Sequence, residues 1–531
     1  MNQIPGILGG LTGVGDLLGR NARLFPSKSG LIFGDVHLGW REVNTRCCRF
    51  ANALLKLGVG RGDRVALYAS NSHQWVEASF ALSKIGAVVV TVNDRLSPPE
   101  VAYILENSRA IGLITARPQL ASAQAAAARA PACRLLIGID AGAPDLLDYE
   151  TLLAEASDAE PLLDPPLKAE EASMLLYTSG TTGFPKGAIY THGSTLLGML
   201  IHAHAIGSRT THRVMLPSPL YSAAGTAGIY CAVYAGSTSV IVNFDVETAL
   251  RTLERECITF TNLVPTTIQR LLARDDFDQY DLSALDTILY GGSPIAVPVL
   301  REARRRLPGC RFRQTFASTE TGTAGTVLEP EDHDLALADP ACEHLLLSCG
   351  RPQLGVDLAI FDADGRELPP GEVGEIAVRT EANMAGFWNN PEATAKAMRN
   401  GWVLTGDMAR RDEHGYFYLV DRKNDMIVTG AFNVYPSEVE RVLQDHPAVY
   451  EVAVVGVPSV EWGEAVKAVV VLRPGQTVTE GDLIRHCEGR IAGYKKPKSV
   501  DFVESLPRNA TGKVLHRRLR ESYWQDQGRK I

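Results

Sequence analysis

The sequence predicts an α/β fold: a large N-terminal domain of two α/β sheet lobes with a small β-rich subdomain, followed by a small α+β C-terminal domain. Three observations predict it. First, apolar strand-like runs alternate with helically spaced stretches at 62–115 and at 239–292. Second, short strands with alternating apolar residues follow position 350. Third, after about position 421 the expected elements follow the order helix, strand, strand, helix. The chain has 531 residues, of which 45% are hydrophobic and 21% charged, so it is long and apolar enough to bury several cores.

The first lobe follows a strand–helix–strand order. Apolar runs at 64–68 and 87–91 flank a helically spaced stretch at 72–84. A second helix is expected at 98–108, because its two leading prolines suit a first helical turn, and 111–115 predicts a further buried strand. This alternation predicts a parallel sheet.

The second lobe repeats the alternation. Apolar runs predict strands at 239–242, 260–264 and 288–290, and helical spacing predicts helices at 246–255 and 266–272. A second parallel sheet is therefore expected.

The kind and order of the expected secondary-structure elements change twice after the second lobe. Short strands separated by Gly and Pro turns are expected at 356–361, 374–379 and 415–420. Beyond them the order is helix, strand, strand, helix, at 433–443, 452–457, 465–472 and 479–490. We expect the domain boundary at 422–424, which divides the chain into 1–422 and 423–531.

The composition excludes several classes of protein. With 53 Lys and Arg against 61 Asp and Glu, the formal net charge is −8 and the pI about 5.9, so no global positive field favours a nucleic acid. Nine cysteines without disulfide or zinc spacing predict a reducing, cytoplasmic compartment. No run of about 18 apolar residues occurs, so no integral membrane segment is expected.

One short stretch carries the strongest chemical signal. Residues 177–187 read YTSGTTGFPKG and lie between two apolar runs. Glycines let backbone N–H groups approach a phosphate, hydroxyls donate further hydrogen bonds, and Lys186 supplies positive charge. The stretch is not a Walker loop, because Gly187 follows the lysine where Ser or Thr would stand. It predicts a triphosphate-binding loop, and the alternative is a flexible polar surface loop.

Seven motifs in order resemble those of the adenylate-forming superfamily, which includes acyl-CoA synthetases, luciferases and peptide-synthetase adenylation domains. The phosphate loop resembles that family's signature. The other six are GGSP at 291–294, QTFASTE at 314–320, TGD at 405–407, DRKND at 421–425, AFNVYPSE at 431–438 and PRNATGK at 507–513. They resemble, among others, the family's adenine-side turn, its ribose-binding aspartate and its hinge.

The resemblance implies a reaction in two halves. A carboxylate attacks the α-phosphate of ATP to give an acyl-adenylate and pyrophosphate, and a thiol then attacks the acyl carbon and releases AMP. It also implies that residues 1–422 bind ATP and the acid, and that residues 423–531 form a mobile domain carrying the catalytic lysine, Lys513.

The family's functional positions map onto matching residues of this chain. The expected catalytic residues are Lys513, Thr182 and Glu320, and Glu320 is also the expected Mg²⁺ ligand. The expected ATP and AMP site comprises Thr178, Ser179, Gly180, Thr181, Thr182, Gly183, Lys186, Gly292, Ser293, Phe316, Ala317, Thr319, Asp407, Arg422 and Lys513. The expected acyl pocket comprises Tyr221, Ser222, Gly225, Gly291 and Ala317, with Gly430 lining the CoA tunnel and Asn424 at the hinge.

Simpler roles remain open at four of these positions. Lys513 would otherwise be an exposed surface lysine, and Glu320 a supporting residue at a helix N-terminus. Asp407 would cap a turn, and Gly430 would be an ordinary turn glycine.

Four residues depart from the family's usual pattern. Phe316 replaces a tyrosine, which keeps an aromatic face for adenine but loses a hydroxyl. Ser222 replaces a histidine and Ala317 a glycine near the expected carboxylate, while Asn424 stands where a charged hinge residue is usual. Because no Lys or Arg occurs in the acyl stretches, the expected acid is apolar: aromatic, alicyclic or medium-chain.

The resemblance thus implies an ATP-dependent carboxylic acid–CoA ligase of the AMP-forming acyl-CoA synthetase type, with ATP, Mg²⁺ and CoA as cofactors or co-substrates. A small carboxylic acid is its expected partner, without nucleic acid, and a homodimer is one assembly open to it. One alternative is an adenylating enzyme that passes the acyl group to a carrier-protein thiol or to a luciferase-like oxidation. Another is a non-catalytic nucleotide-binding protein.

Overall fold

The computed structural model divides the chain into two compact units. One comprises residues 1–358 and 378–403, and the other comprises 359–377 and 404–531. The structure describes residues 11–143, 146–178, 185–292, 295–422, 425–429, 432–459, 462–488, 490–491, 493–508 and 514–524. The chain passes between the units within β17 (Asp357–Phe361), β18 (Gly374–Arg379) and β20 (Trp402–Arg411).

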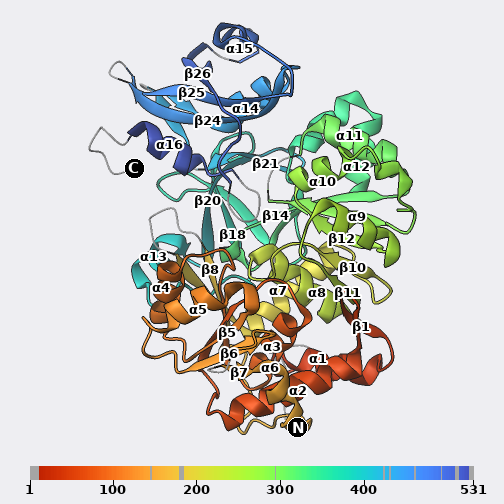
Figure 1. The fold of residues 1–531 in the computed structure, drawn as a ribbon. Coiled ribbons are helices and arrows are strands. Elements are labelled where there is room, and N and C mark those ends of the chain that lie inside the picture. Colours follow the sequence, from red (N-terminus) through yellow and green to blue (C-terminus); the bar gives the residue numbers. More distant parts are fainter. Residues whose placement is uncertain are drawn as a thin grey trace. The chain divides into compact units, whose positions relative to one another are not determined.

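The first lobe is built on a seven-stranded sheet with the order β7-β6-β5-β3-β4-β8-β9 (Figure 1). Its strands are parallel except for β9, which runs antiparallel to β8. The strands are β3 (Arg64–Tyr68), β4 (Val88–Thr91), β5 (Gly112–Ala116), β6 (Leu135–Ile139), β7 (Leu147–Asp148), β8 (Ala172–Thr178) and β9 (Lys186–Thr191). The helices are α2 (Trp40–Lys56), α3 (His73–Lys84), α4 (Pro98–Ser108), α5 (Leu120–Ala127) and α6 (Tyr149–Ala154). The parallel arrangement predicted for this lobe is confirmed.

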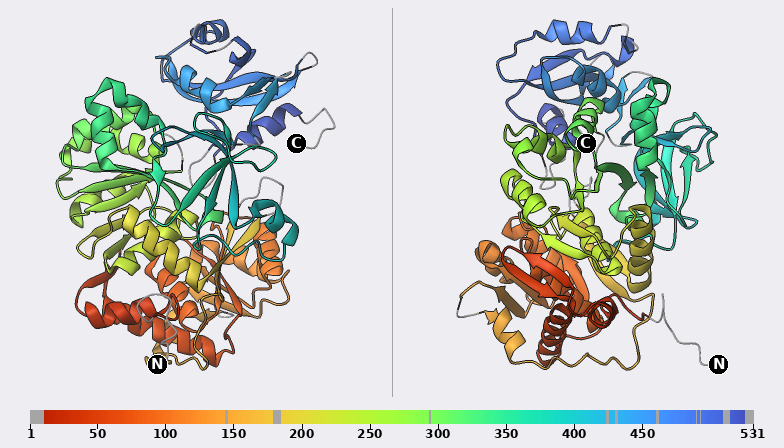
Figure 2. Two further views of the ribbon diagram at one scale, coloured as in Figure 1. Left: turned by 180° about the vertical axis from the view of Figure 1, so that it is seen from behind. Right: turned by 90° about the vertical axis from the view of Figure 1, so that its right-hand side faces the viewer.

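The second lobe is built on a nine-stranded sheet with the order β16-β15-β14-β13-β12-β10-β11-β1-β2. The part of this lobe after residue 210 is coloured yellow-green to green in Figure 2. Its strands are β1 (Ser29–Phe33), β2 (Val36–Gly39), β10 (Arg213–Leu216), β11 (Thr238–Ile241), β12 (Phe260–Leu263), β13 (Thr287–Gly291), β14 (Arg311–Ala317), β15 (Gly325–Leu328) and β16 (Arg351–Pro352). Its helices are α7 (His192–Ala205), α8 (Ala223–Ala235), α9 (Val246–Arg255), α10 (Pro265–Leu272), α11 (Val297–Arg306) and α12 (Pro330–Ala338). The early hairpin β1–β2 joins this sheet through parallel pairing of β1 with β11, which the sequence analysis did not foresee.

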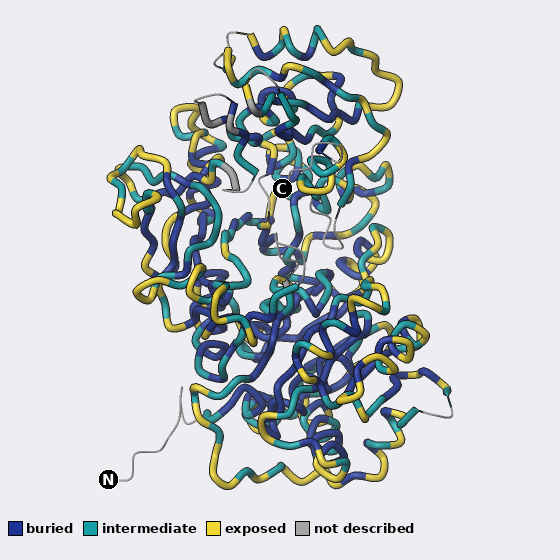
Figure 3. The backbone as a smooth tube through the Cα atoms, turned by 90° about the vertical axis from the view of Figure 1, so that its left-hand side faces the viewer, coloured by how far each residue is buried: buried dark blue, intermediate teal, exposed yellow. Residues whose placement is uncertain are grey.

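The main core lies between these two sheets and joins the lobes. It combines Leu31 and Ile241 of one sheet with Val65 and Leu176 of the other. Helix α3 runs through it with all twelve residues buried, and Figure 3 shows how continuous the burial is in this region. Helix α1 (Asp16–Leu24) adds further buried leucines. Because a core of this kind fixes strand ends in place, the loops that follow the strands have a rigid base.

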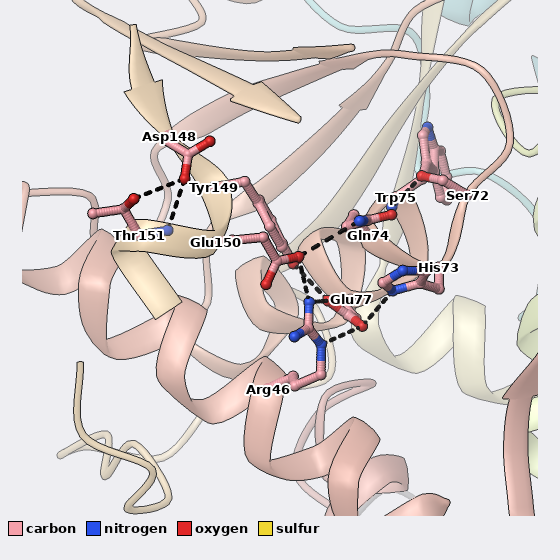
Figure 4. A network of polar contacts seen from close by, with 10 residues as sticks. All are labelled: Arg46, Ser72, His73, Gln74, Trp75, Glu77, Asp148, Tyr149, Glu150 and Thr151. Atoms are coloured by element: carbon pink, nitrogen blue, oxygen red, sulfur yellow. Dashed lines mark hydrogen bonds and ion pairs between the residues drawn. The ribbon is translucent and has the colours of Figure 1, made fainter. Parts of the chain in front are cut away.

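A buried carboxylate on α3 is neutralised inside this core. Glu77 is fully buried, and its oxygens accept hydrogen bonds from Arg46 at 2.8 and 3.0 Å and from the hydroxyl of Tyr149 at 3.0 Å (Figure 4). A ring nitrogen of His73 lies 2.8 Å from the same carboxylate. Burial alone would raise the pKa of Glu77, but the hydrogen bonds with His73 and Arg46 outweigh burial and hold it below its usual value. The network ties α2, α3 and α6 together.

The second unit contains the C-terminal α+β domain. Its sheet has the order β23-β22-β25-β24, with β26 pairing β25. The strands are β22 (Ile427–Thr429), β23 (Phe432–Val434), β24 (Val449–Ser459), β25 (Gly463–Leu472) and β26 (Ser499–Phe502), and the helices are α14 (Pro436–Gln444), α15 (Glu480–His486) and α16 (His516–Trp524). The α+β character is as predicted, with the strands β22, β23 and β26 and the helix α16 in addition.

The β-rich subdomain is shared by the two units. In the second unit β20 pairs antiparallel with β21 (Phe417–Arg422), and in the first β20 pairs antiparallel with β19 (Met398–Arg399), which follows α13 (Pro391–Ala397). Within the part of the chain that the structure describes, no helix has both the length and the hydropathy needed to cross a membrane.

Candidate nucleotide and acid site

The ends of the expected triphosphate loop are held together by a strand pair. β8 ends at Thr178 and β9 begins at Lys186, and these two residues are register partners in the antiparallel ladder. The ladder continues to Tyr177 and Gly187. The residues on the two sides of the expected loop are therefore fixed next to each other by the sheet. The loop residues Ser179, Gly180, Thr181, Thr182 and Gly183 lie outside the described residues, as does the side chain of Thr178.

The segment 384–388 connects Lys186's strand to the turn that carries Glu320. The N–H of Trp388 donates to the carbonyl of Gly187 at 2.8 Å, and two more backbone hydrogen bonds join 385–386 to Ile189. At the other end, the N–H of Met384 donates to the carbonyl of Glu320 at 3.0 Å. One segment thus bonds both to the backbone of Glu320 and to that of Gly187, the residue after Lys186.

Glu320 lies in the 3-10 turn Thr319–Thr321, at the end of the second sheet. Ser318 and Thr321 form the capping box of this turn, so capping does not depend on Glu320. Gly322 closes the turn at φ 63°, and a Cβ there would lie 1.9 Å from the carbonyl oxygen of Ala382. The Tyr190 hydroxyl donates to the carbonyl of Thr319 at 2.5 Å. The backbone of the turn that carries Glu320 is thus fixed by its capping box, by close packing of Gly322 on Ala382 and by the hydrogen bond from Tyr190.

The adenine-side residues follow the neighbouring strands β13 and β14. Gly291 pairs with Thr315, and a Cβ on Gly291 would lie 2.5 Å from the Thr315 carbonyl oxygen. Gly292 follows at φ 78°, a value that favours glycine. Phe316 and Ala317 end β14, so all four residues lie at the same carboxyl edge of the parallel sheet. Ser293 lies outside the described residues.

The expected acyl residues at 221–225 form the start of helix α8. Ser222 is its N-cap: its hydroxyl donates to the Pro219 carbonyl at 2.7 Å and accepts from the Gly225 N–H at 3.2 Å. A Cβ on Gly225 would lie 2.0 Å from the carbonyl oxygen of Pro219. Ser222, which was expected in the acyl pocket, therefore secures the start of a helix. Tyr221 is buried, and its hydroxyl has no hydrogen-bond partner among the described residues.

An apolar cavity of about 30 Å³ lies along helices α7 and α8. It is lined by Met174, Leu176, Tyr190, Thr195, Gly198, Met199, Ala223, Thr226, Ala227, Tyr230, Cys231, Gly322 and Thr323. Gly322 and Thr323 directly follow the Glu320 turn, and Tyr190 bonds to that turn. None of the residues expected in the acyl pocket is among the lining residues, although Tyr221, Ser222 and Gly225 are close in sequence to the lining residues at 223 and 226.

Sequence reasoning missed this lining. The signal for it was the run of small residues AAGTAG at 223–228, which leaves space along one face of α8.

Asp407 lies on β20 in the second unit, where its register partner on β21 is Arg422. The hydroxyl of Thr405 accepts from the Asp407 N–H at 3.1 Å, and both residues lie within β20 rather than in a turn. Glu375 accepts from the N–H of Gly406 at 3.0 Å, a contact that sequence reasoning did not foresee. The ladder thus brings the two expected ribose-side positions opposite each other, while the side chain of Arg422 lies outside the described residues.

Three expected residues of the C-terminal domain, Asn424, Gly430 and Lys513, lie outside the described residues. The flanks of the Lys513 segment are described. Arg508 and Val514 form an isolated bridge, and the Leu515 N–H donates to the Pro507 carbonyl at 2.8 Å. The chain segments before and after 509–513 therefore lie side by side.

Two family models match the chain. An AMP-binding enzyme model covers residues 18–388, and an AMP-binding enzyme C-terminal domain model covers 438–513. The chain belongs to the AMP-binding enzyme family. This confirms the adenylate-forming superfamily that the seven motifs predicted.

The sequence similarity to several relatives extends over nearly the whole length of the chain. A feruloyl-CoA synthase of Amycolatopsis sp. is 37% identical over 96% of this chain and 99% of its own length. The long-chain-fatty-acid–CoA ligase FadD13 of Mycobacterium tuberculosis is 34% identical over 92% of this chain and 94% of its own. The crystal structure of the anthranilate CoA ligase AuaEII with anthranoyl-AMP matches with a TM-score of 0.87 at 29% identity, covering 96% of this chain and 97% of that one. The prediction of an AMP-forming acyl-CoA synthetase is thereby confirmed.

Proposed function

We propose that this protein joins a small, apolar carboxylic acid to CoA through an acyl-adenylate, with release of pyrophosphate and AMP. The observation that carries the proposal is the tie between Gly187 and Glu320 through the segment 384–388. It joins the strand that follows the hydroxyl- and glycine-rich sequence to the turn that carries Glu320, in a chain that covers 99% of the length of a feruloyl-CoA synthase.

In the first half-reaction, a carboxylate oxygen of the acid forms a bond to the α-phosphorus of ATP. The bond from that phosphorus to the bridging oxygen breaks, and the electron pair leaves with pyrophosphate. Two anions meet in this step, so fixed positive charge and hydrogen bonds must offset their repulsion. Lys186 and Thr182 are the proposed partners of the departing pyrophosphate, and Lys513 is the proposed partner of the α-phosphate.

Mg²⁺ fits this arrangement through Glu320. Among the described residues no group of three or more His, Cys, Asp or Glu side chains could form a metal cage. Mg²⁺ does not need one, because it commonly binds one or two carboxylates together with substrate phosphates. When bound, the ion neutralises phosphate charge, and Glu320 on its pinned turn is the proposed protein ligand.

Asp407 is the proposed ribose ligand. A carboxylate can accept hydrogen bonds from both vicinal hydroxyls of a ribose. Asp407 and Arg422 are register partners on β20 and β21, and Arg422 is proposed to support the contact.

In the second half-reaction, a thiol attacks the acyl carbon and AMP leaves. CoA is the proposed thiol, and Gly430 is proposed to line the tunnel for its narrow pantetheine arm. Asn424 is proposed as the hinge about which residues 423–531 rotate relative to residues 1–422 between the two half-reactions. A carrier-protein thiol is the alternative acceptor.

The proposed acid is aromatic, alicyclic or medium-chain. The cavity beside the Glu320 turn is lined almost wholly by apolar and small side chains, with no charged residue among them. A second carboxylate would therefore be buried without a partner there.

The test is a panel of carboxylic acids assayed for AMP release with ATP, Mg²⁺ and CoA. CoA-dependent AMP release together with a thioester product supports the ligase. Acid-dependent pyrophosphate release without CoA-dependent turnover would instead indicate a different acceptor, and no acid-dependent release of either product would contradict the proposed function. The cytoplasmic location and the homodimer stay predictions, which fractionation and mass measurement of the native protein would check.

A further inference from the structure

The cavity beside the Glu320 turn has two different ends. Ala223, Ala227 and Thr323 are half-buried and mark the open end, which lies next to the turn because Thr323 is three residues after Glu320. Tyr230 and Cys231 are buried and lie two helical turns after Ala223 and about one turn after Ala227. At 1.5 Å per residue, the distance along the helix from 223 to 230 is roughly 10 Å.

Tyr230 is held rigidly at the inner end. Its hydroxyl lies 2.5 Å from the hydroxyl of Ser79 on α3, and its ring lies 4.9 Å from that of Phe80 between centroids. Burial raises the pKa of the phenol well above its usual value, so it stays neutral. With one hydrogen bond and one ring contact fixing it, this side chain has little freedom to move aside.

The side walls differ from the end. Met174 and Met199 line them, and methionine adapts its shape because its side chain is unbranched and flexible. At about 30 Å³ the cavity is far below the roughly 150 Å³ of an apolar cavity that binds benzene, so an acid must widen it. The methionines can yield, whereas the Tyr230 end cannot, since α3 lies directly behind it.

We infer that Tyr230 sets the maximum length of the acid that this enzyme activates. The inference rests on the proposed function and makes it more specific. The preferred substrate is an acid whose apolar part ends within about two helical turns of the Glu320 turn, as a single ring on a short arm or a medium chain does. Longer chains are excluded by a locked aromatic ring.

Straight-chain acids of six to sixteen carbons test this, with kcat/KM for CoA-dependent AMP release as the readout. In wild type we expect kcat/KM to fall steeply beyond medium length. Tyr230→Ala removes the end wall, so the ratio of kcat/KM for long over medium acids should rise at least tenfold, through a lower KM for the long acids and an unchanged KM for ATP. Tyr234→Ala is the matched control: this tyrosine lies one turn further on the same helix, beside Arg20 and outside the cavity, and the ratio should not change.

Two further variants keep the test decisive. Tyr230→Phe keeps the ring and should keep the wild-type ratio, whereas Tyr230→Leu, which preserves an apolar core if the alanine variant does not fold, should raise it. An unchanged ratio in the variants without the ring would overturn the inference, as would an equal rise in Tyr234→Ala. Absence of AMP release from wild type with every acid would instead refute the proposed function itself, so the two failures are distinguishable.

Discussion

The hydroxyl of Tyr177 donates a hydrogen bond of 2.6 Å to the side-chain oxygen of Asn107. The backbone carbonyl of the same asparagine accepts from the indole N–H of Trp388 and from the side-chain amide of Asn389, each at 3.1 Å. Tyr177 precedes the expected triphosphate loop, and Trp388 bonds to Gly187, which follows it. Asn107, at the end of α4, thus anchors both sides of the base of that loop.

Asn107→Ala should weaken this anchor. It leaves the Tyr177 hydroxyl without its partner in a partly buried site, at a cost of about 1 kcal/mol in the free energy of unfolding. Because the loop base is less ordered, the KM for ATP should rise about tenfold, with a smaller change in the KM for the acid. Denaturant unfolding and steady-state kinetics measure both quantities.

The double variant Asn107→Ala/Tyr177→Phe separates anchoring from mere loss of side chains. Removing both partners leaves no orphaned hydroxyl, so part of the lost stability should return. Asn52→Ala is the control, since Asn52 donates to the carbonyls of Ser157 and Ala159, away from the loop. A rise in the KM for ATP in the control would count against a specific role of Asn107.

Stability should depend on pH through Glu77. Its pKa in the folded protein lies below the unfolded value of about 4.5. Between these two pKa values the unfolded state binds more protons than the folded state, so the free energy of unfolding rises with pH in that window. The stabilisation that Glu77 contributes is present above the unfolded pKa and is lost as the pH falls through the folded pKa. Glu77→Gln should flatten this acid-side slope and destabilise the protein by several kcal/mol at neutral pH, because Arg46 loses a buried partner.

Glu150 gives the matched control for that prediction. It bonds to the same guanidinium at 2.7 Å, but its side chain is 45% exposed. Glu150→Gln should therefore cost less than about 1 kcal/mol and leave the acid-side slope as in wild type. Unfolding curves at several pH values below 6 compare the three proteins. Equal slopes for wild type and Glu77→Gln would show that other groups control acid unfolding.

The sequence was most informative where periodicity and burial agree. The predicted elements 64–68, 98–108, 246–255 and 374–379 have the same bounds as β3, α4, α9 and β18. Strand pairing across long separations was not predictable in this way. β1 and β2 belong to the second sheet although 170 or more residues separate them from β10, because pairing depends on tertiary packing rather than on local pattern.

The same distinction between local pattern and tertiary contact holds for the residues of the candidate site. Motif spacing indicated Glu320 and Asp407, but it could not reveal that a distant segment at 384–388 bonds to both Gly187 and Glu320. Nor could it show that Ser222 is a helix cap, since a serine beside a small-residue run fits a pocket as well as an N-cap. Local chemistry is visible in sequence, whereas the contacts that position it come from the fold.

Lys513→Ala should separate the two half-reactions. Its ammonium is proposed to stabilise charge that develops on the α-phosphate, so adenylation should slow by roughly 100-fold or more. A supplied acyl-adenylate should still be converted to thioester at close to the wild-type rate. Acid-dependent pyrophosphate exchange measures the first step and thioester formation the second. Lys498→Ala, which removes an exposed lysine of the same unit, is the control; equal losses in both half-reactions of Lys513→Ala would refute the divided role.

Gly430→Leu should have the opposite effect. A glycine in a tunnel leaves room for a thin pantetheine arm, and a leucine would fill that room. Pyrophosphate exchange should therefore stay within about twofold of wild type while thioester formation falls at least 100-fold. Gly493→Leu is the control, because a Cβ at Gly493 meets no atom within 4 Å and its φ is not in the left-handed region. If pyrophosphate exchange fell together with thioester formation in Gly430→Leu alone, Gly430 would be a structural turn residue, since a blocked thiol path leaves the first half-reaction intact.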